Sequence, residues 1–257
     1  MLTRRSFSMG QRLRAASLAV LTVALAVTTA GPALAGAPRG GGEDAALPAV
    51  VQPPKKCAQA SLTAGWQDFD LVIATAVALA ESGCDPKAKS TNPPTKDCPR
   101  GSTDRGAFQI NSCYHSEVTD ECAYDLECNA GSAYQIWAED GGSFQQWTVY
   151  TQRTFKTRLT EARKAVKKIT GENFVVGIVT TVDDVPLSVH KKPNTTSKIL
   201  RTLDGQAVIN IDCQIKGEKV HSTVFDYDTK IWDKVGPGYV SDGYVFTDSS
   251  GWVGRRC

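Results

Sequence analysis

The sequence has few of the residues that metal and nucleic-acid sites require. It contains only three histidines, His115, His190 and His221, and its eight cysteines include no C-x-x-C pair, which disfavours a zinc site. Its 29 basic and 27 acidic residues nearly balance, with a formal net charge of +2. We therefore expect no metal, no cofactor and no nucleic-acid partner.

Long apolar segments are also missing, apart from one near the N-terminus. Four arginines precede an apolar stretch over 15–27, and Ala33-Leu34-Ala35 forms an A-x-A cleavage signal. The stretch is short and interrupted by Ser and Thr, so we interpret residues 1–35 as a signal peptide rather than a retained membrane span. The Arg4-Arg5 pair favours Tat export and a disulfide-rich cargo favours Sec, so the route stays open. Cleavage removes four arginines and no acidic residue, which changes the formal net charge to −2.

All eight cysteines follow the expected signal peptide. An even number in an exported chain predicts four disulfides. Six cysteines lie between Cys57 and Cys128, and the other two are Cys213 and Cys257, which suggests two separately cross-linked units. We expect a Cys213–Cys257 bridge that fixes the last residue of the second unit.

A single carboxylate ends the most apolar helical segment of the chain. Within residues 71–80 the only polar side chain is Thr75, which predicts a buried helix with Asp70 as its N-cap and Gly83 as its terminator. Glu81 then falls in the last turn, where apolar surroundings and the helix dipole both raise the pKa of a carboxyl group. Such a group suits a general acid for glycoside cleavage. The alternative is a glutamate that simply reaches solvent at a helix end.

The pattern of the remaining chain divides it into three parts. Residues 36–56 are rich in Gly, Pro and Ala and predict a flexible leader. Apolar residues at helical spacing over 130–137 and 155–169 predict amphipathic helices. From Phe174 onward, alternating segments such as 209–215, separated by turn signals, predict a small all-β barrel.

Four segments, in the same order, resemble motifs of the soluble lytic transglycosylase family and its goose-type lysozyme relatives. Residues 81–88 (ESGCDPKA) resemble E-S-x-x-x-P-x-A, and residues 106–111 (GAFQIN) resemble G-L-x-Q-I-N. Residues 125–134 are similar to D-x-x-x-N-x-x-x-G-x-x-Y, with imperfect spacing before the tyrosine. Residues 147–153 resemble the stretch that contains Y-N-x-G, which reads YTQR here. The ordered set is more specific than any single motif.

The resemblance implies an enzyme in which Glu81 is the single catalytic residue. In the family, this glutamic acid protonates the β-1,4 glycosidic oxygen between MurNAc and GlcNAc. The resulting carboxylate then takes a proton from the sugar's own 6-hydroxyl, which leaves a 1,6-anhydro-muramic end. Water in place of that hydroxyl would make the protein a hydrolytic lysozyme. The nearest other carboxylates, Asp104, Glu117 and Asp120, match no motif, so a pair of catalytic carboxylates is not evident.

The resemblance also implies a set of substrate contacts. These are Ser82, Gln109, Asn111, Asn129 and Tyr150. The alternatives are a local backbone partner for Ser82, the start of a helix for Asn129, and an aromatic core position for Tyr150.

Looser motifs near the C-terminus resemble a bacterial Src-homology-3-like domain of cell-wall enzymes. Residues 187–190 (LSVH) stand for its L-N-V-R, and residues 239–245 (YVSDGYV) resemble its Y-V-x-x-x-Y-V strand. The implied architecture is a mainly α lysozyme-like domain at 57–171, followed by a small all-β Src-homology-3-like barrel at 172–257. The resemblance implies that this barrel binds the cell wall; the alternative is a spacer that binds nothing.

Together these patterns predict an exported, wall-associated and monomeric peptidoglycan lytic transglycosylase. A hydrolytic lysozyme and a non-catalytic wall-binding protein are the alternatives. Six cysteines in the first unit allow 15 connectivities. Short loops beside the expected cleft suggest Cys84 with Cys98 and Cys113 with Cys122, which leaves Cys57 with Cys128.

Overall fold

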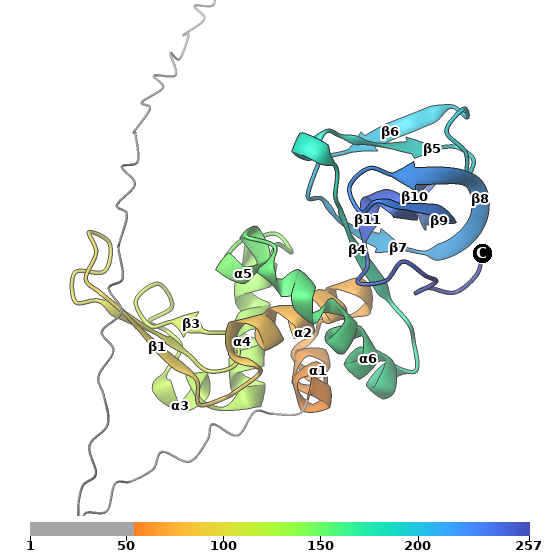
Figure 1. The fold of residues 1–257 in the computed structure, drawn as a ribbon. Coiled ribbons are helices and arrows are strands. Elements are labelled where there is room, and N and C mark those ends of the chain that lie inside the picture. The colour runs from red at the N-terminus through yellow and green to blue at the C-terminus, as the bar shows by residue number, and fades with distance from the viewer. Residues whose placement is uncertain (1–53) are drawn as a thin grey trace, which may run out of the picture. The chain divides into compact units, whose positions relative to one another are not determined.

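The computed structural model describes residues 54–257, in which a helical region is followed by a β-rich region (Figure 1). The expected signal peptide (1–35) and nearly all of the expected leader (36–56) lie outside the described residues. The first helix, α1, begins at Pro54 and so includes the last three residues of the expected leader. Within residues 54–257, every helix falls short of the length and hydrophobicity that a bilayer crossing requires.

The helical region combines helices with one small antiparallel sheet. The expected helix over 130–137 lies within α4, and the one over 155–169 divides between η1 and α6. The sheet has the strand order β1-β2-β3. The elements are α1 (Pro54–Ala64), α2 (Asp68–Ser82), β1 (Lys89–Asn92), β2 (Ser102–Arg105), β3 (Ile110–Asn111), α3 (Asp120–Ala123), α4 (Leu126–Glu139), α5 (Thr148–Thr151), the 3-10 helix η1 (Thr154–Arg158) and α6 (Leu159–Thr170).

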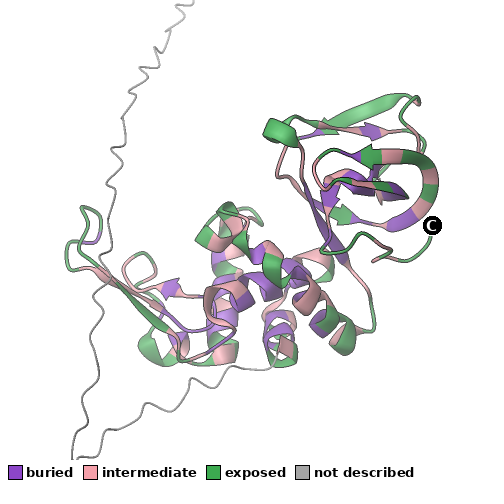
Figure 2. Cartoon of the chain, viewed as in Figure 1, coloured by how far each residue is buried: buried purple, intermediate pink, exposed green. Residues whose placement is uncertain are grey.

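Helix α2 is the buried centre of this region, as its composition predicts. Residues 71–79 are all buried, and the helix packs against α1, α6 and η1 (Figure 2). Gly83 ends the helix in the left-handed conformation with φ 67°, and its N–H donates to the carbonyl oxygen of Leu79 at 3.0 Å. The expected N-cap, Asp70, is wrong because the helix already begins at Asp68 and Gln67 occupies the N-cap position.

The β-rich region contains two sheets. Their strand orders are β6-β5-β10-β9-β8 and β11-β4-β7. The expected strand over 209–215 is interrupted at Asp212, between β7 and β8. In the described residues the pairing does not close into a barrel, so the expected Src-homology-3-like barrel is not confirmed. The elements are β4 (Val175–Val179), η2 (Val182–Asp184), β5 (Leu187–His190), β6 (Ile199–Leu203), β7 (Val208–Ile211), β8 (Cys213–Ser222), β9 (Tyr227–Val235), β10 (Gly238–Ser241), η3 (Asp242–Tyr244) and β11 (Val245–Phe246).

The disulfides stay within the two regions, and each joins cysteines that are consecutive in the sequence. The Cys213–Cys257 bridge is present as expected. The three pairings expected in the helical region are wrong. Helix α1 packs against α2 and thus brings Cys57 to Cys84, two residues after the end of α2. The other two bridges of the helical region close loops with sequence separations of 15 and 6. The pairs are Cys57–Cys84, Cys98–Cys113 and Cys122–Cys128.

The cross-links are separate, but the apolar core is continuous between the two regions. Val176 and Ile178 of β4 are buried in the same cluster as the helices, and β4 packs against α2. The ring of Phe69 on α2 meets that of Phe174 edge to face, with the centroids 5.6 Å apart. Two separately cross-linked units therefore share part of one core.

Candidate functional site

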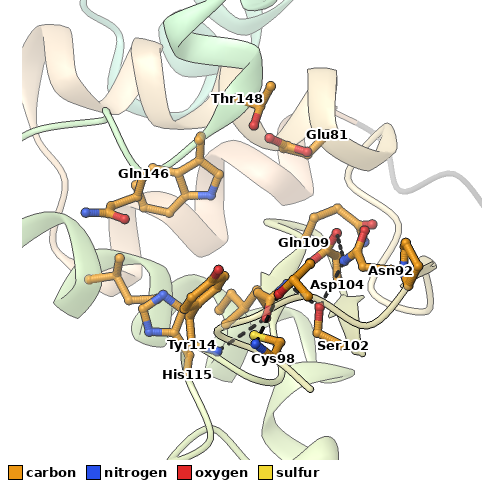
Figure 3. Close-up of a pocket in the computed structure, with 16 residues that line it drawn as sticks. Glu81, Asn92, Cys98, Ser102, Asp104, Gln109, Tyr114, His115, Gln146 and Thr148 are labelled. Carbon is orange, nitrogen blue, oxygen red and sulfur yellow. Dashed lines mark hydrogen bonds between the residues drawn. The ribbon is translucent and has the colours of Figure 1, made fainter. Parts of the chain in front are cut away.

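A cavity of about 600 Å³ opens between the end of α2, the small sheet and the segment before α5 (Figure 3). Most of its lining side chains are polar. They come from three stretches of sequence: Glu81; Asn92, Pro93, Thr95, Cys98, Ser102, Asp104, Gln109, Ile110, Asn111, Tyr114 and His115; and Ile136, Gln146, Trp147 and Thr148.

Glu81 faces this cavity from the last turn of α2 (Figure 3). Burial of the side chain raises the pKa of its carboxyl group from 4.5 to about 7. The backbone N–H of Val149 acts in the opposite direction, and the negative charge of Asp104 raises the pKa further. Near neutral pH, Glu81 can therefore hold a proton or release it, which is what a general acid requires.

A second carboxylate, Asp104 on β2, also lines the cavity. Its Oδ1 accepts a hydrogen bond from Asn111 Nδ2 at 2.7 Å, and its Oδ2 accepts one from Asn92 Nδ2 at 2.9 Å. Both amides also donate to Ser102 Oγ, at 2.8 Å from Asn111 and 3.2 Å from Asn92. This network fixes Asp104 in a polar wall of the cavity.

The place of Asp104 in the cavity follows from strand pairing, which the sequence does not reveal. Asp104 and Asn111 are direct partners in the β2–β3 register, and Asn92 pairs with Ser102 between β1 and β2. These short polar strands lack the alternation that would reveal them. The other nearby carboxylates lie outside the cavity lining: Glu117 pairs with His115, and the exposed Asp120 pairs with Arg105.

Two of the expected substrate contacts, Gln109 and Asn111, do line the cavity. Gln109 adopts φ 50°, and its Nε2 donates to the carbonyl oxygen of Gly106 at 2.8 Å. The amide of Asn111 donates to Asp104 and so holds that cavity side chain in place. Both residues are thus fixed before any ligand binds.

Asn129, by contrast, does not line the cavity. Its side chain is fully buried, and its Oδ1 accepts the N–H of Phe108 at 2.8 Å. Its Nδ2 donates to the carbonyl oxygens of Arg105 and Ala123, at 3.1 and 2.9 Å. These bonds use both ends of the amide to hold the loop at 105–108 and the turn after α3, so the side chain has a structural role.

Ser82 and Tyr150 are also absent from the cavity lining. Ser82 Oγ donates to the carbonyl oxygen of Ala107 at 2.8 Å and accepts the N–H of Asp85 at 3.1 Å, so it has backbone partners. The ring of Tyr150 stacks on Phe155, with the centroids 5.1 Å apart. In the structure Ser82 thus bonds to backbone groups, and Tyr150 occupies an aromatic packing position.

The cavity also contains side chains that are not among the expected substrate contacts. Tyr114 and His115 follow β3, and Gln146 and Thr148 flank Trp147. The indole Nε1 of Trp147 donates to the carbonyl oxygen of Phe108 at 3.0 Å, which fixes this wall against the loop before β3. Across residues 54–257, no three His, Cys, Asp or Glu side chains gather as a metal site would require.

The part of the chain that builds this cavity matches a known protein family. Residues 58–149 match a family model described as a lysozyme-like domain. No curated protein matches the chain. The matched segment contains every residue that lines the cavity, from Glu81 to Thr148. The part of the chain that builds the candidate site is therefore similar to lysozyme-like domains.

Proposed function

We propose that this protein is an exported enzyme that cleaves the glycan strands of peptidoglycan, with Glu81 as the catalytic acid. The observation that carries the proposal is a carboxyl group with a pKa of about 7 that faces a polar cavity of about 600 Å³. A match to a lysozyme-like domain over the same residues supports glycosidic-bond cleavage. Four disulfides support an oxidising, extracellular location.

The proposed reaction is lytic transglycosylation of the MurNAc–GlcNAc β-1,4 bond. Protonated Glu81 donates its proton to the bridging oxygen, and the GlcNAc that leaves carries this proton as its new hydroxyl. The Glu81 carboxylate then removes the proton of the MurNAc 6-hydroxyl, whose oxygen bonds to the anomeric carbon. The muramic product has a 1,6-anhydro ring, and Glu81 is again protonated.

Hydrolysis is the second candidate, and the position of Asp104 favours it. Glycosidases that use water or a covalent intermediate employ a second carboxylate on the other side of the scissile bond. Asp104 lines the same cavity as Glu81, and its charge raises the Glu81 pKa. In this reaction Asp104 would stabilise positive charge at the anomeric carbon or orient a water molecule.

Digestion of purified sacculi separates these reactions. The transglycosylase releases fragments with 1,6-anhydro ends, lighter by one water than hydrolytic products, and Asp104→Asn keeps most of the activity. The hydrolase releases reducing muramic ends, and Asp104→Asn loses most of the activity. Mass spectrometry of the released fragments measures the outcome. If no soluble fragment appears from the wild-type protein, the enzymatic proposal fails and a non-catalytic wall-binding protein is left.

We further propose that residues 172–257 bind the cell wall. A second cavity of about 360 Å³ in the β-rich region supports this, because exposed apolar side chains of Val182 and Val185 line it. Val185→Asp should reduce retention of the full chain on insoluble sacculi. Ile199→Asp, at an exposed position outside that cavity, is the matched control and should be retained like the wild type. Equal retention of all three proteins would contradict wall binding through this cavity.

A further inference from the structure

Tyr114 is the most exposed of the large apolar residues in 54–257, with an exposed fraction of 63 %. Its position explains little of the fold, because an exposed ring contributes little to the core. It is nevertheless part of the cavity lining that contains Glu81. A large aromatic side chain at the rim of a polar cavity needs an explanation other than packing.

The backbone at Tyr114 is held firmly although its ring is exposed. Asn111 Oδ1 accepts the N–H groups of Cys113 and Tyr114, at 2.9 and 3.3 Å. The Cys98–Cys113 disulfide ties the neighbouring residue to the loop between β1 and β2. The ring is therefore presented from a fixed backbone, which lowers the entropy that a ligand must overcome.

The ring of Tyr114 is also free to accept a ligand. Within the described part of the chain, its hydroxyl makes no hydrogen bond and its ring makes no aromatic pair. The rest of the cavity offers amide and hydroxyl groups, such as those of Gln109 and Gln146. A pyranose ring matches both surfaces, because its C–H groups form an apolar face and its hydroxyls form a polar edge.

We propose that Tyr114 is a sugar-stacking residue that binds the apolar face of one pyranose ring of the glycan. This inference rests on the proposed function, because it takes a glycan as the ligand of the cavity. Figure 3 shows Tyr114 beside His115, on the side of the cavity away from Glu81 and Thr148. The stacked sugar therefore lies away from the bond that Glu81 would protonate, and Tyr114 contributes to binding rather than to the chemical step.

Binding in a Glu81→Gln background tests this inference without cleavage of the ligand. The probe is purified, uncross-linked glycan of alternating GlcNAc and MurNAc, and calorimetry measures its affinity. Adding Tyr114→Ala should weaken binding about tenfold, whereas Tyr114→Phe should bind within about threefold of the parent. Trp252→Ala, which removes an exposed aromatic ring outside this cavity, is the matched control and should leave the affinity unchanged.

A fluorescence measurement separates stacking from a structural effect. In the same Glu81→Gln background, Tyr114→Trp should show a glycan-dependent change in emission beyond that of the parent. In the active protein, Tyr114→Ala should raise KM about tenfold and change kcat less than about twofold. Unweakened glycan binding by Tyr114→Ala overturns the stacking role alone. An absence of glycan binding by the Glu81→Gln parent overturns both this role and the proposed function.

Discussion

The guanidinium group of Arg153 joins the helical region to the β-rich region. Its Nε donates to the backbone carbonyl oxygen of Gln206 at 2.9 Å, and its Nη1 donates to that of Tyr150 at 2.6 Å. Arg153 has φ 60°, in the left-handed region that favours glycine. It occupies the position of the final glycine in the Y-N-x-G pattern that residues 147–153 resemble, and here its side chain forms a link between the regions.

The shared core predicts that the two regions unfold together. Ile178→Ala on β4 should lower the free energy of unfolding by about 2–5 kcal/mol, because it leaves a cavity between β4 and the helices. Ile199→Ala is the matched control: it makes the same change at an exposed position and should cost less than about 0.5 kcal/mol. Urea unfolding followed by circular dichroism measures both. Two separate transitions in the wild type would contradict the shared core.

The buried amide of Asn129 should matter for stability rather than for substrate affinity. Asn129→Ala leaves the N–H of Phe108 and two carbonyl oxygens without partners, so we expect a loss of roughly 2–5 kcal/mol in unfolding free energy. Thermal unfolding and steady-state kinetics at a temperature where the variant is folded measure the two effects. A raised KM at unchanged stability would instead restore Asn129 as a substrate contact.

Some of this site can be predicted from the sequence, and the reasons differ from residue to residue. Glu81 and Gly83 are visible because a continuous apolar helix and its glycine terminator are local patterns. The position of Asp104 in the cavity cannot be predicted in this way, because it depends on pairing among three short polar strands. Tyr114 carries no periodic signal. The Cys57–Cys84 pair depends on how α1 packs against α2, which spacing alone does not determine.

The raised pKa of Glu81 predicts the pH dependence of cleavage. Activity needs the protonated acid, so kcat/KM should fall as the pH rises through about 7. Because the charge of Asp104 raises the Glu81 pKa, Asp104→Asn should lower it. NMR titration of the Glu81 carboxyl carbon measures this shift without depending on activity. Glu127→Gln, an exposed position outside the cavity, is the control. An unchanged or higher Glu81 pKa in Asp104→Asn would refute this electrostatic coupling.

A buried pair of carboxyl groups in the β-rich region predicts that stability falls as the pH rises. Asp233 and Asp242 are fully buried, and Gln214 Nε2 donates to both, at 2.7 and 3.3 Å. Burial raises the pKa of each carboxyl, and for Asp242 the charge of Asp233 raises it further. The native state thus keeps protons that the unfolded chain loses above about pH 4.

Asp233→Asn should reduce this pH dependence. Its amide can occupy the position of the protonated carboxyl, and one titrating group is removed. The wild type should lose up to about 1.4 kcal/mol per pH unit for each retained proton as the pH rises from about 4 into the neutral range. The variant should lose less, and it should be the more stable protein at pH 8. Urea unfolding at pH 5 and pH 8 measures the difference. Equal slopes for the two proteins would contradict proton retention by Asp233 in the native state.

The central claim, that Glu81 supplies the proton for glycan cleavage, is tested most directly by the rate at which Glu81→Gln releases soluble fragments from sacculi. Glutamine has nearly the same size but cannot donate a carboxyl proton, so we expect a rate loss of at least about 10²–10⁴-fold. The free energy of unfolding should change by less than about 1 kcal/mol, because a protonated glutamate and a glutamine make similar demands on the site. Cleavage by a folded Glu81→Gln protein at the wild-type rate would contradict the account.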